Sequence, residues 1–137
     1  MLALCTIRIV GDVPDFDDPE VNYRSPLQYG VTRIRVEIGK LRGDVRWFVV
    51  QLEKNTGDRY GFDQDWGQVA RFDHHPEADW GHDIRKEGLH IDLYRGGQKV
   101  QVRRDFANVP LNRAPAYCEK FLEQNEKPIL RSFGPDK

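Results

Sequence analysis

All four histidines of the chain fall between residues 71 and 95, in the stretch RFDHHPEADWGHDIRKEGLHIDLYR. Aspartates and glutamates lie between them, and an Arg-x-Asp sequence, Arg71 to Asp73, opens the stretch. Imidazole exchanges protons near neutral pH, a carboxylate can orient an imidazole, and arginine holds phosphate through its bidentate fork. These residue types suit either acid–base chemistry at a phosphate or the binding of a metal ion.

The acid–base interpretation depends on two predicted strands, residues 69–73 and 89–95. Cleavage of RNA at its 2′-hydroxyl needs a base for the hydroxyl proton, an acid for the leaving oxygen and a cation for the phosphate. If the two strands pair, the polar side chains at their alternate positions share one face and lie within reach of one another. The candidate residues of this metal-free and cofactor-free site are Arg71, Asp73, His75, His82, His90 and Asp92, with Arg71, Lys86 or Arg95 as the phosphate-binding cation.

The metal interpretation has weaker geometry. Its potential ligands are His74, His75, Glu77, Asp79 and His82. Adjacent histidines on extended backbone project in different directions, so His74 and His75 are not expected to bind the same ion. Pro76 also excludes a regular helix that would place histidines four residues apart on one face. We therefore expect no native metal ion at these residues.

Alternation of apolar and polar residues predicts the elements that must position these side chains. The predicted strands are residues 4–10, 30–38, 45–52, 69–73, 89–95 and 98–104. The strand at 45–52 is apolar on both faces and is expected near the middle of the sheet. Gly96 and Gly97 predict a two-residue turn between the last two strands. Residues 74–88 are longer than a hairpin connection needs, which indicates a functional loop.

Helical spacing of apolar residues predicts one helix over about residues 113–126, capped by Asn112, with Pro115 in its first turn and Pro128 at its end. The tail after Pro128 is expected to be loose. A chain of 137 residues is the size of one domain. We expect a single α+β domain over residues 1–137, in which an antiparallel sheet of five to seven strands packs one C-terminal helix on one face.

Charge and hydropathy limit the class of partner. The net charge is −1, so a phosphate-containing partner would have to be held by a local basic patch. Residues 11–20 form an acidic loop in the prediction. Cys5 and Cys118 match no zinc or redox motif and are expected to be free, buried thiols. No apolar run reaches membrane length and no secretory leader is recognised, so a cytoplasmic location without membrane contact is expected.

A non-catalytic function is the alternative. Arg33 and Arg35 share the polar face of their strand, and Arg103 and Arg104 end the last predicted strand. Basic strands with nearby aromatic residues suit single-stranded nucleic acid, and they suit an acidic protein equally well. This pattern favours a β-rich binding or accessory domain that uses a basic sheet face.

The run Arg71-Phe72-Asp73-His74-His75-Pro76-Glu77, followed by His82 and His90, resembles the core motif of TumE-type toxins of bacterial toxin–antitoxin systems. By position, Arg71, Asp73, His75 and Glu77 match the first part of that motif, and His82 matches the second part loosely. Asp73 runs directly into His74, where the family usually has a short spacer. The resemblance implies a small β-rich toxin that acts on RNA and is neutralised by an antitoxin protein. Together with the acid–base interpretation, it favours a metal-independent endoribonuclease.

Overall fold

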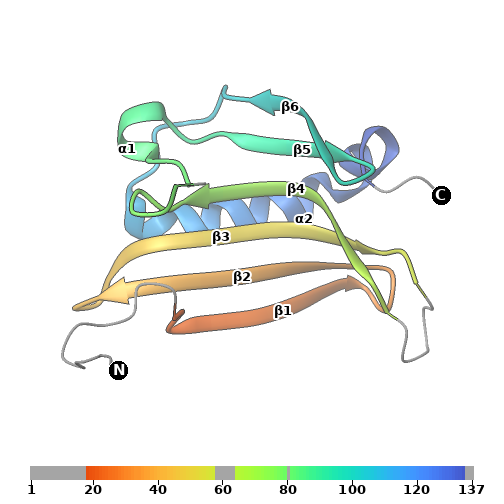
Figure 1. Cartoon of the computed structure of the whole chain (residues 1–137), viewed down its shortest axis with the longest axis horizontal. Helices are drawn as coiled ribbons and strands as arrows, with labels where there is room; N and C mark the ends of the chain where they lie inside the picture. The colour runs from red at the N-terminus through yellow and green to blue at the C-terminus, as the bar shows by residue number, and fades with distance from the viewer. Residues whose placement is uncertain (1–17, 58–63, 80, 135–137) are drawn as a thin grey trace.

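The computed structural model describes residues 18–57, 64–79 and 81–134. Six antiparallel strands form one sheet in which each strand pairs with its neighbours in the sequence, in the order β1-β2-β3-β4-β5-β6. A long helix, α2, lies along one face of this sheet (Figure 1). The expected α+β fold is therefore confirmed. The elements are β1 (Val21–Gln28), β2 (Thr32–Leu41), β3 (Asp44–Asn55), β4 (Trp66–His74), α1 (Ile84–Glu87), β5 (Ile91–Arg95), β6 (Gln98–Arg103), a 3₁₀ turn (Leu111–Arg113) and α2 (Ala114–Ser132).

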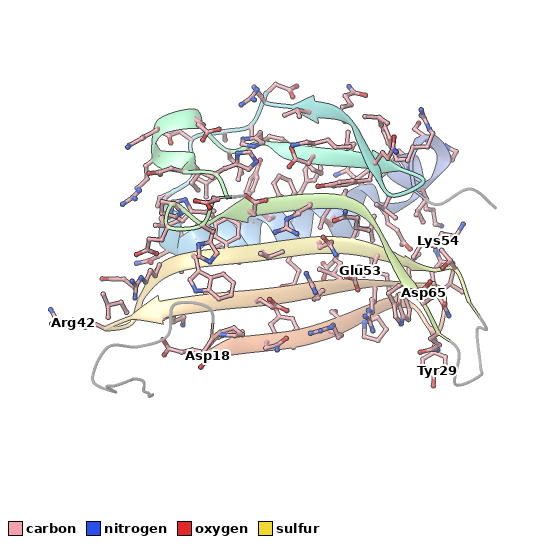
Figure 2. The ribbon with its side chains drawn as sticks, viewed as in Figure 1. Asp18, Tyr29, Arg42, Glu53, Lys54 and Asp65 are labelled. Carbon is pink, nitrogen blue, oxygen red and sulfur yellow. The ribbon has the colours of Figure 1, made fainter. Side chains whose placement is uncertain are left out.

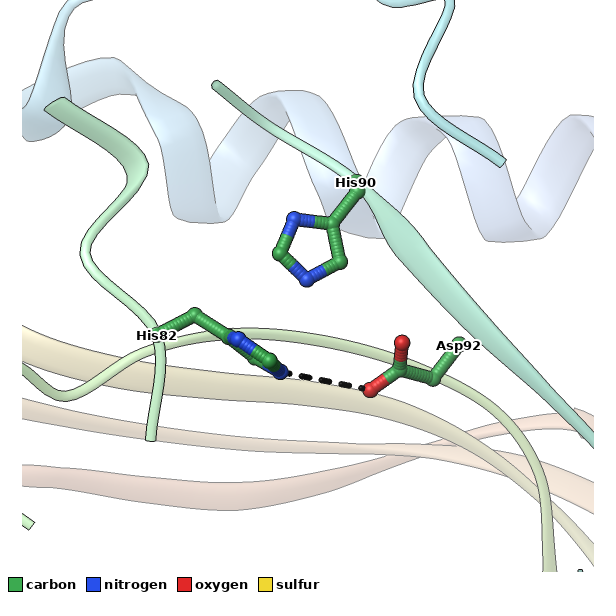
Figure 3. A group of neighbouring side chains, drawn as sticks. All are labelled: His82, His90 and Asp92. Carbon is green, nitrogen blue, oxygen red and sulfur yellow. Dashed lines mark ion pairs between the residues drawn. The ribbon is translucent and has the colours of Figure 1, made fainter. Parts of the chain in front are cut away.

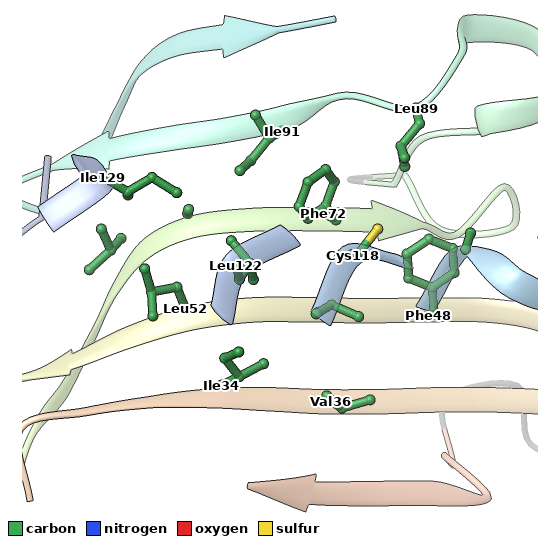
Figure 4. Close-up of a cluster of buried hydrophobic side chains, with 14 of the residues drawn as sticks. Ile34, Val36, Phe48, Leu52, Phe72, Leu89, Ile91, Cys118, Leu122 and Ile129 are labelled. Atoms are coloured by element: carbon green, nitrogen blue, oxygen red, sulfur yellow. The ribbon is translucent and has the colours of Figure 1, made fainter. Parts of the chain in front are cut away.

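The hydrophobic core lies between the sheet and α2. Alternate residues of the strands, among them Ile34, Phe48 and Phe72, point toward the helix and are fully buried (Figure 4). Cys118 and Leu122 of α2 pack against them from the other side. Removing one such large apolar side chain from water contributes about 1.5–3 kcal/mol, so the core fixes which face of each strand turns away from the helix.

Strand β3 is the central strand that its sequence predicts. It pairs with β2 on one side and β4 on the other, and residues 47–53 are buried without interruption. The two-residue turn between β5 and β6 is also confirmed. Gly96 and Gly97 both have positive φ, 59° and 84°, a conformation in which a side chain would be strained.

The first strand of the sheet was not predicted. β1 contains Pro26 and few apolar residues, and it pairs with β2 alone. Proline is tolerated there because an edge strand leaves one row of backbone donors unpaired. The predicted strand at residues 4–10 and Cys5 lie outside the described residues, as does most of the acidic loop. Val100, on edge strand β6, is exposed.

The predicted end of the helix is wrong. α2 continues through Pro128 to Ser132, because proline's fixed φ is compatible with helix and Ile129 beyond it is buried in the core. The chain after the helix is docked as well, since the Gly134 N–H donates to the Tyr94 carbonyl (2.7 Å). Pro115 lies in the first turn, as expected.

Asn112 does not cap the helix. Its side chain instead accepts a hydrogen bond from the Val45 N–H (2.8 Å) and donates one to Asp44 (2.9 Å). Asn112 therefore ties the start of the helical segment to β3.

Neither described helix has both the length and the apolar content needed to cross a membrane.

Candidate functional site

The face of the sheet opposite α2 carries polar side chains in cross-strand register, and we call it the polar face. Arg71 of β4 lies directly opposite Asp92 of β5, and its Nε donates to Asp73 Oδ2 at 3.0 Å. Both aspartates are nearly fully buried. Strands β4 and β5 therefore pair as the acid–base interpretation required. The polar face comprises Arg33, Arg35, Gln51, Glu53, Arg71, Asp73 and Asp92.

The loop between β4 and β5 folds back over this strand pair. The His75 N–H donates to the His82 carbonyl (2.7 Å), which closes the loop. Gly81 allows this close approach, because a Cβ at that position would lie 2.2 Å from the carbonyl oxygen of His75. Asp83 then caps the short helix α1 by accepting from the Arg85 N–H (3.0 Å). These contacts place the His82 side chain over β5.

His82 is held by three neighbours. Its Nε2 lies 3.6 Å from Asp92 Oδ2, and its Nδ1 lies 3.4 Å from Glu87 Oε1. The ring of His90 meets it edge-on, with centroids 4.3 Å apart. Figure 3 shows both imidazoles and the Asp92 carboxylate turned toward a common point. His90 in turn contacts the Gly88 carbonyl through Nδ1 (3.2 Å).

A hollow of about 200 Å³ opens beside this cluster, and we call it the β4–β5 hollow. Lys99 of β6 reaches into it, with Nζ 3.6 Å from Asp92 Oδ2. Burial, reinforced by the negative charge of Asp92, raises the pKa of the Tyr94 phenol, so this group stays protonated at neutral pH. The hollow is lined by Gln68, Arg71, Asp73, His82, Asp92, Tyr94 and Lys99.

The other two histidines lie elsewhere. His75, a predicted site residue, is 1% exposed and stacks on the ring of Trp47 with centroids 4.9 Å apart. It does not line the hollow, and its backbone rather than its ring helps to position His82. His74 is buried beside Phe48, and its Nδ1 accepts from the Ile84 N–H (3.1 Å). Burial lowers the pKa of His74, which favours the neutral ring.

The predicted cations are only partly correct. Arg71 lines the hollow, but Arg95 donates to the Ser132 carbonyl (2.8 Å) and Lys86 is exposed on α1. Lys99 supplies the second cation of the hollow, and it was not predicted. The sequence did contain the information needed to place Lys99 beside Tyr94. A two-residue turn at Gly96 and Gly97 pairs Tyr94 with Lys99 across the hairpin, as is observed.

A larger hollow of about 560 Å³ lies near the turn between β2 and β3. There Arg46 binds Glu77 through a bidentate contact, with N···O distances of 2.8–3.2 Å. This contact lowers the pKa of Glu77. Because Glu77 is bound to an arginine, it does not join the histidines as a metal ligand. His74 is the only histidine that lines this hollow, and it is fully buried. The larger hollow therefore offers no partly exposed imidazole for proton transfer, whereas the β4–β5 hollow offers His82.

Positive charge on the polar face is largely compensated. The buried carboxylate of Glu53 accepts from Arg33 Nε (2.8 Å), and Arg35 Nε lies 3.6 Å from it. Figure 2 labels Glu53 among the side chains of the sheet. The guanidinium of Arg33 also covers the ring of Trp66 at 4.0 Å. The sequence pattern did not include Glu53 on this face, so the expected basic surface at Arg33 and Arg35 is less basic than the residue types suggested.

The fold and the hollow define a class of protein: a six-stranded antiparallel sheet backed by one helix, with a cluster of ionisable groups on the polar face. The chain belongs to the family described as "Domain of unknown function (DUF7718)", whose family model matches residues 18–136. No curated protein and no solved structure matches the chain.

Proposed function

We propose that the β4–β5 hollow cleaves RNA by metal-independent acid–base chemistry. The observation that carries this proposal is the position of His82, whose side chain is 23% exposed and lies against Asp92 at the rim of a hollow that also holds two cations. An imidazole accepts and returns protons near neutral pH, and Arg71 and Lys99 can neutralise a phosphate between them. Acid, base and cation thus come from one small cavity.

Each group has a role in a cleavage that uses the 2′-hydroxyl as nucleophile. His82 accepts the proton of the 2′-hydroxyl while the 2′-oxygen bonds to phosphorus. The bond from phosphorus to the 5′-oxygen breaks, and the protonated phenol of Tyr94 gives its proton to that oxygen. The products are a 2′,3′-cyclic phosphate and a free 5′-hydroxyl. His82 then releases its proton to solvent, and solvent restores the proton to Tyr94.

The remaining predicted residues act through these groups. Asp92 and His90 orient the His82 ring, and Asp73 holds the Arg71 guanidinium toward the hollow. His75 contributes through the loop closure described above, so it is a positioning residue in this proposal.

The proposal also covers where the protein acts and what restrains it. An RNA-cleaving protein of this kind acts in the cytoplasm, and its activity would have to be restrained by a partner protein. The resemblance of residues 71–90 to TumE-type toxins supports an antitoxin in that role.

The test uses the purified full chain and a 5′-labelled RNA oligonucleotide in buffer containing EDTA. We expect fragments that end in a 2′,3′-cyclic phosphate, and at least a hundredfold lower rate for His82→Gln, within the range that general acid–base groups contribute. Lys86→Ala, an exposed change on α1, is the matched control and should cleave at the wild-type rate.

Intact RNA with the wild-type protein would contradict the proposal, and so would equal cleavage by His82→Gln. An oligonucleotide with 2′-deoxyribose at the cleaved position should resist the enzyme, which separates this chemistry from water-dependent hydrolysis. RNA that is bound but never cut, with binding lost on charge reversal at Arg33 and Arg35, would instead support the binding alternative.

A further inference from the structure

Three potential metal ligands meet at the rim of the β4–β5 hollow. One ligand atom from each of His82, His90 and Asp92 lies within 4.8 Å of the other two. Ligand atoms around a tetrahedral zinc ion are separated by roughly 3.4 Å, given metal–ligand bonds of about 2.0–2.1 Å. The distance from His82 Nε2 to Asp92 Oδ2, 3.6 Å, is already close to that value. Small side-chain rotations would bring the third atom into place.

Both imidazoles have their Nδ1 atoms engaged. His90 Nδ1 contacts the Gly88 carbonyl, which can only accept, so this nitrogen carries the hydrogen. His82 Nδ1 faces the Glu87 carboxylate in the same manner. The Nε2 lone pairs are therefore left for the common point that Figure 3 shows between the three side chains. Metal-binding histidines have this arrangement, in which a carbonyl or carboxylate fixes the second ring nitrogen.

Among the described residues, the ion pair that compensates the negative charge of the cluster comes from a partly exposed lysine. Asp92 is 3% exposed, and its Oδ1 has no hydrogen-bond partner among the described residues. Two imidazole lone pairs and a buried carboxylate that face one another repel unless a positive charge lies between them. Lys99 is the nearest cation, but it is 3.6 Å from Asp92 and its side chain is 45% exposed. It can withdraw into solvent when another cation arrives.

We infer that His82, His90 and Asp92 bind one divalent transition-metal ion, with zinc as the best match to two imidazoles and one carboxylate. Three protein ligands leave a coordination position open toward the hollow for water or an anion. The sequence indicated only one member of this set, His82. The other ligands that it proposed were His74, His75, Glu77 and Asp79, and not His90 and Asp92 around the start of β5.

Zinc binding does not require that the protein cleave RNA, but the two would interfere. The ion would occupy His82 Nε2, the atom that accepts the proton in the proposed cleavage. A saturating concentration of zinc should therefore suppress RNA cleavage, and EDTA should restore it. Zinc binding by a protein that never cuts RNA would leave the metal site intact and remove the proposed function. RNA cleavage in EDTA by a protein that binds no zinc would support the proposed function and remove the metal site.

The test is calorimetric titration of the tag-free full chain with zinc chloride, supported by the visible absorption of Co²⁺ as a probe of the ligand set. We expect one saturable site in the wild type. Asp92→Asn keeps the size of the side chain and should weaken binding at least a hundredfold. Lys99→Met removes the competing cation and should tighten binding about tenfold, a change that a merely structural lysine would not produce.

Two exposed glutamates provide a matched pair of variants that should both fold. Glu87→Ala removes the acceptor behind His82 and should weaken zinc binding about tenfold, as loss of such partners does elsewhere. Glu77→Ala, in the same loop but bound to Arg46, should leave it unchanged. The inference is overturned if no one-site binding occurs below about 100 µM zinc, or if Asp92→Asn and the wild type bind zinc equally while both show native circular dichroism.

Discussion

Buried charge on the polar face is kept only where an opposite charge lies within reach. Asp73 is almost entirely buried, and its Oδ2 accepts from the Arg71 guanidinium at 3.0 Å. Removing one member of such a pair costs more than the pair contributes, because the remaining charge is left buried. Asp92 has a weaker partner, since its ion pair with Lys99 spans 3.6 Å and the lysine side chain is 45% exposed. This difference distinguishes a structural carboxylate from one that is available for binding.

His74 should make the stability of the protein depend on pH. Its ring is buried, and burial lowers its pKa in spite of the nearby carboxylates of Asp83 and Asp73, with Arg85 and His75 adding to the lowering. The unfolded chain therefore binds a proton more readily, and the contribution of His74 is fully present above about pH 6.5 and is lost as the pH falls below it. We expect His74→Asn, which can still accept from the Ile84 N–H, to flatten this dependence by at most about 1.4 kcal/mol per pH unit.

Urea denaturation of both proteins at pH 5.5 and 7.5 measures this effect. Equal loss of unfolding free energy in wild type and variant would mean that other groups cause the acid sensitivity. Gln98→Asn, an exposed change on β6, controls for the introduction of asparagine.

The residues of the site could be predicted in part. Strand alternation was enough to place Arg71, Asp73 and Asp92 on one face, because side-chain direction in a strand depends only on position parity. The placement of His82 was not accessible in the same way. It depends on the approach of Gly81 to the His75 carbonyl, a contact between loop residues that no periodic pattern encodes.

At the level of elements, proline caused both main errors. Pro26 and the polar residues around it concealed edge strand β1, although an edge strand needs only one row of hydrogen bonds. Pro128 suggested a helix end because it lacks the N–H that would bond to the carbonyl four residues earlier. In the structure, burial of Ile129 outweighs that loss, and the helix continues. Tertiary contacts thus decided both cases against local preference.

Replacement of Pro128 should therefore stabilise the protein. Pro128 is exposed in the interior of α2, and Pro128→Ala restores the missing backbone donor to the Gln124 carbonyl without disturbing the core. We expect the free energy of unfolding to rise by about 1–3 kcal/mol, as helix propensity and the recovered hydrogen bond imply. Thermal and urea unfolding measure it. Lys127→Ala, at the exposed neighbouring position, should change stability by less than about 0.5 kcal/mol. An unchanged or lower stability of Pro128→Ala would show that the proline is compensated locally.

In the whole molecule, the number of paired residues differs widely between neighbouring strands of the sheet. The ladders from β1 to β4 run over most of each strand, whereas β4 and β5 are in register at only two pairs, Ala70–Leu93 and Arg71–Asp92. The β5–β6 hairpin is further attached through Gly134, which bonds to Tyr94 and Gly96 beyond the end of α2. The candidate site thus lies at the junction between a long, continuous part of the sheet and a hairpin with few backbone links to it.

This arrangement predicts a graded pattern of amide hydrogen exchange. Amides of β2 and β3 should exchange slowest, since their release requires global unfolding, and those of β5 and β6 should exchange faster through local opening of the hairpin. Because His82 belongs to the loop and Asp92 to β5, an ion bound between them would link both segments and should slow exchange over residues 82–95 with little effect on β2. Exchange mass spectrometry with and without zinc measures both effects, and Asp92→Asn should abolish the second. Equal exchange rates in β2 and β5, at every denaturant concentration, would mean that the sheet opens as one unit and that the site does not lie on a weak junction.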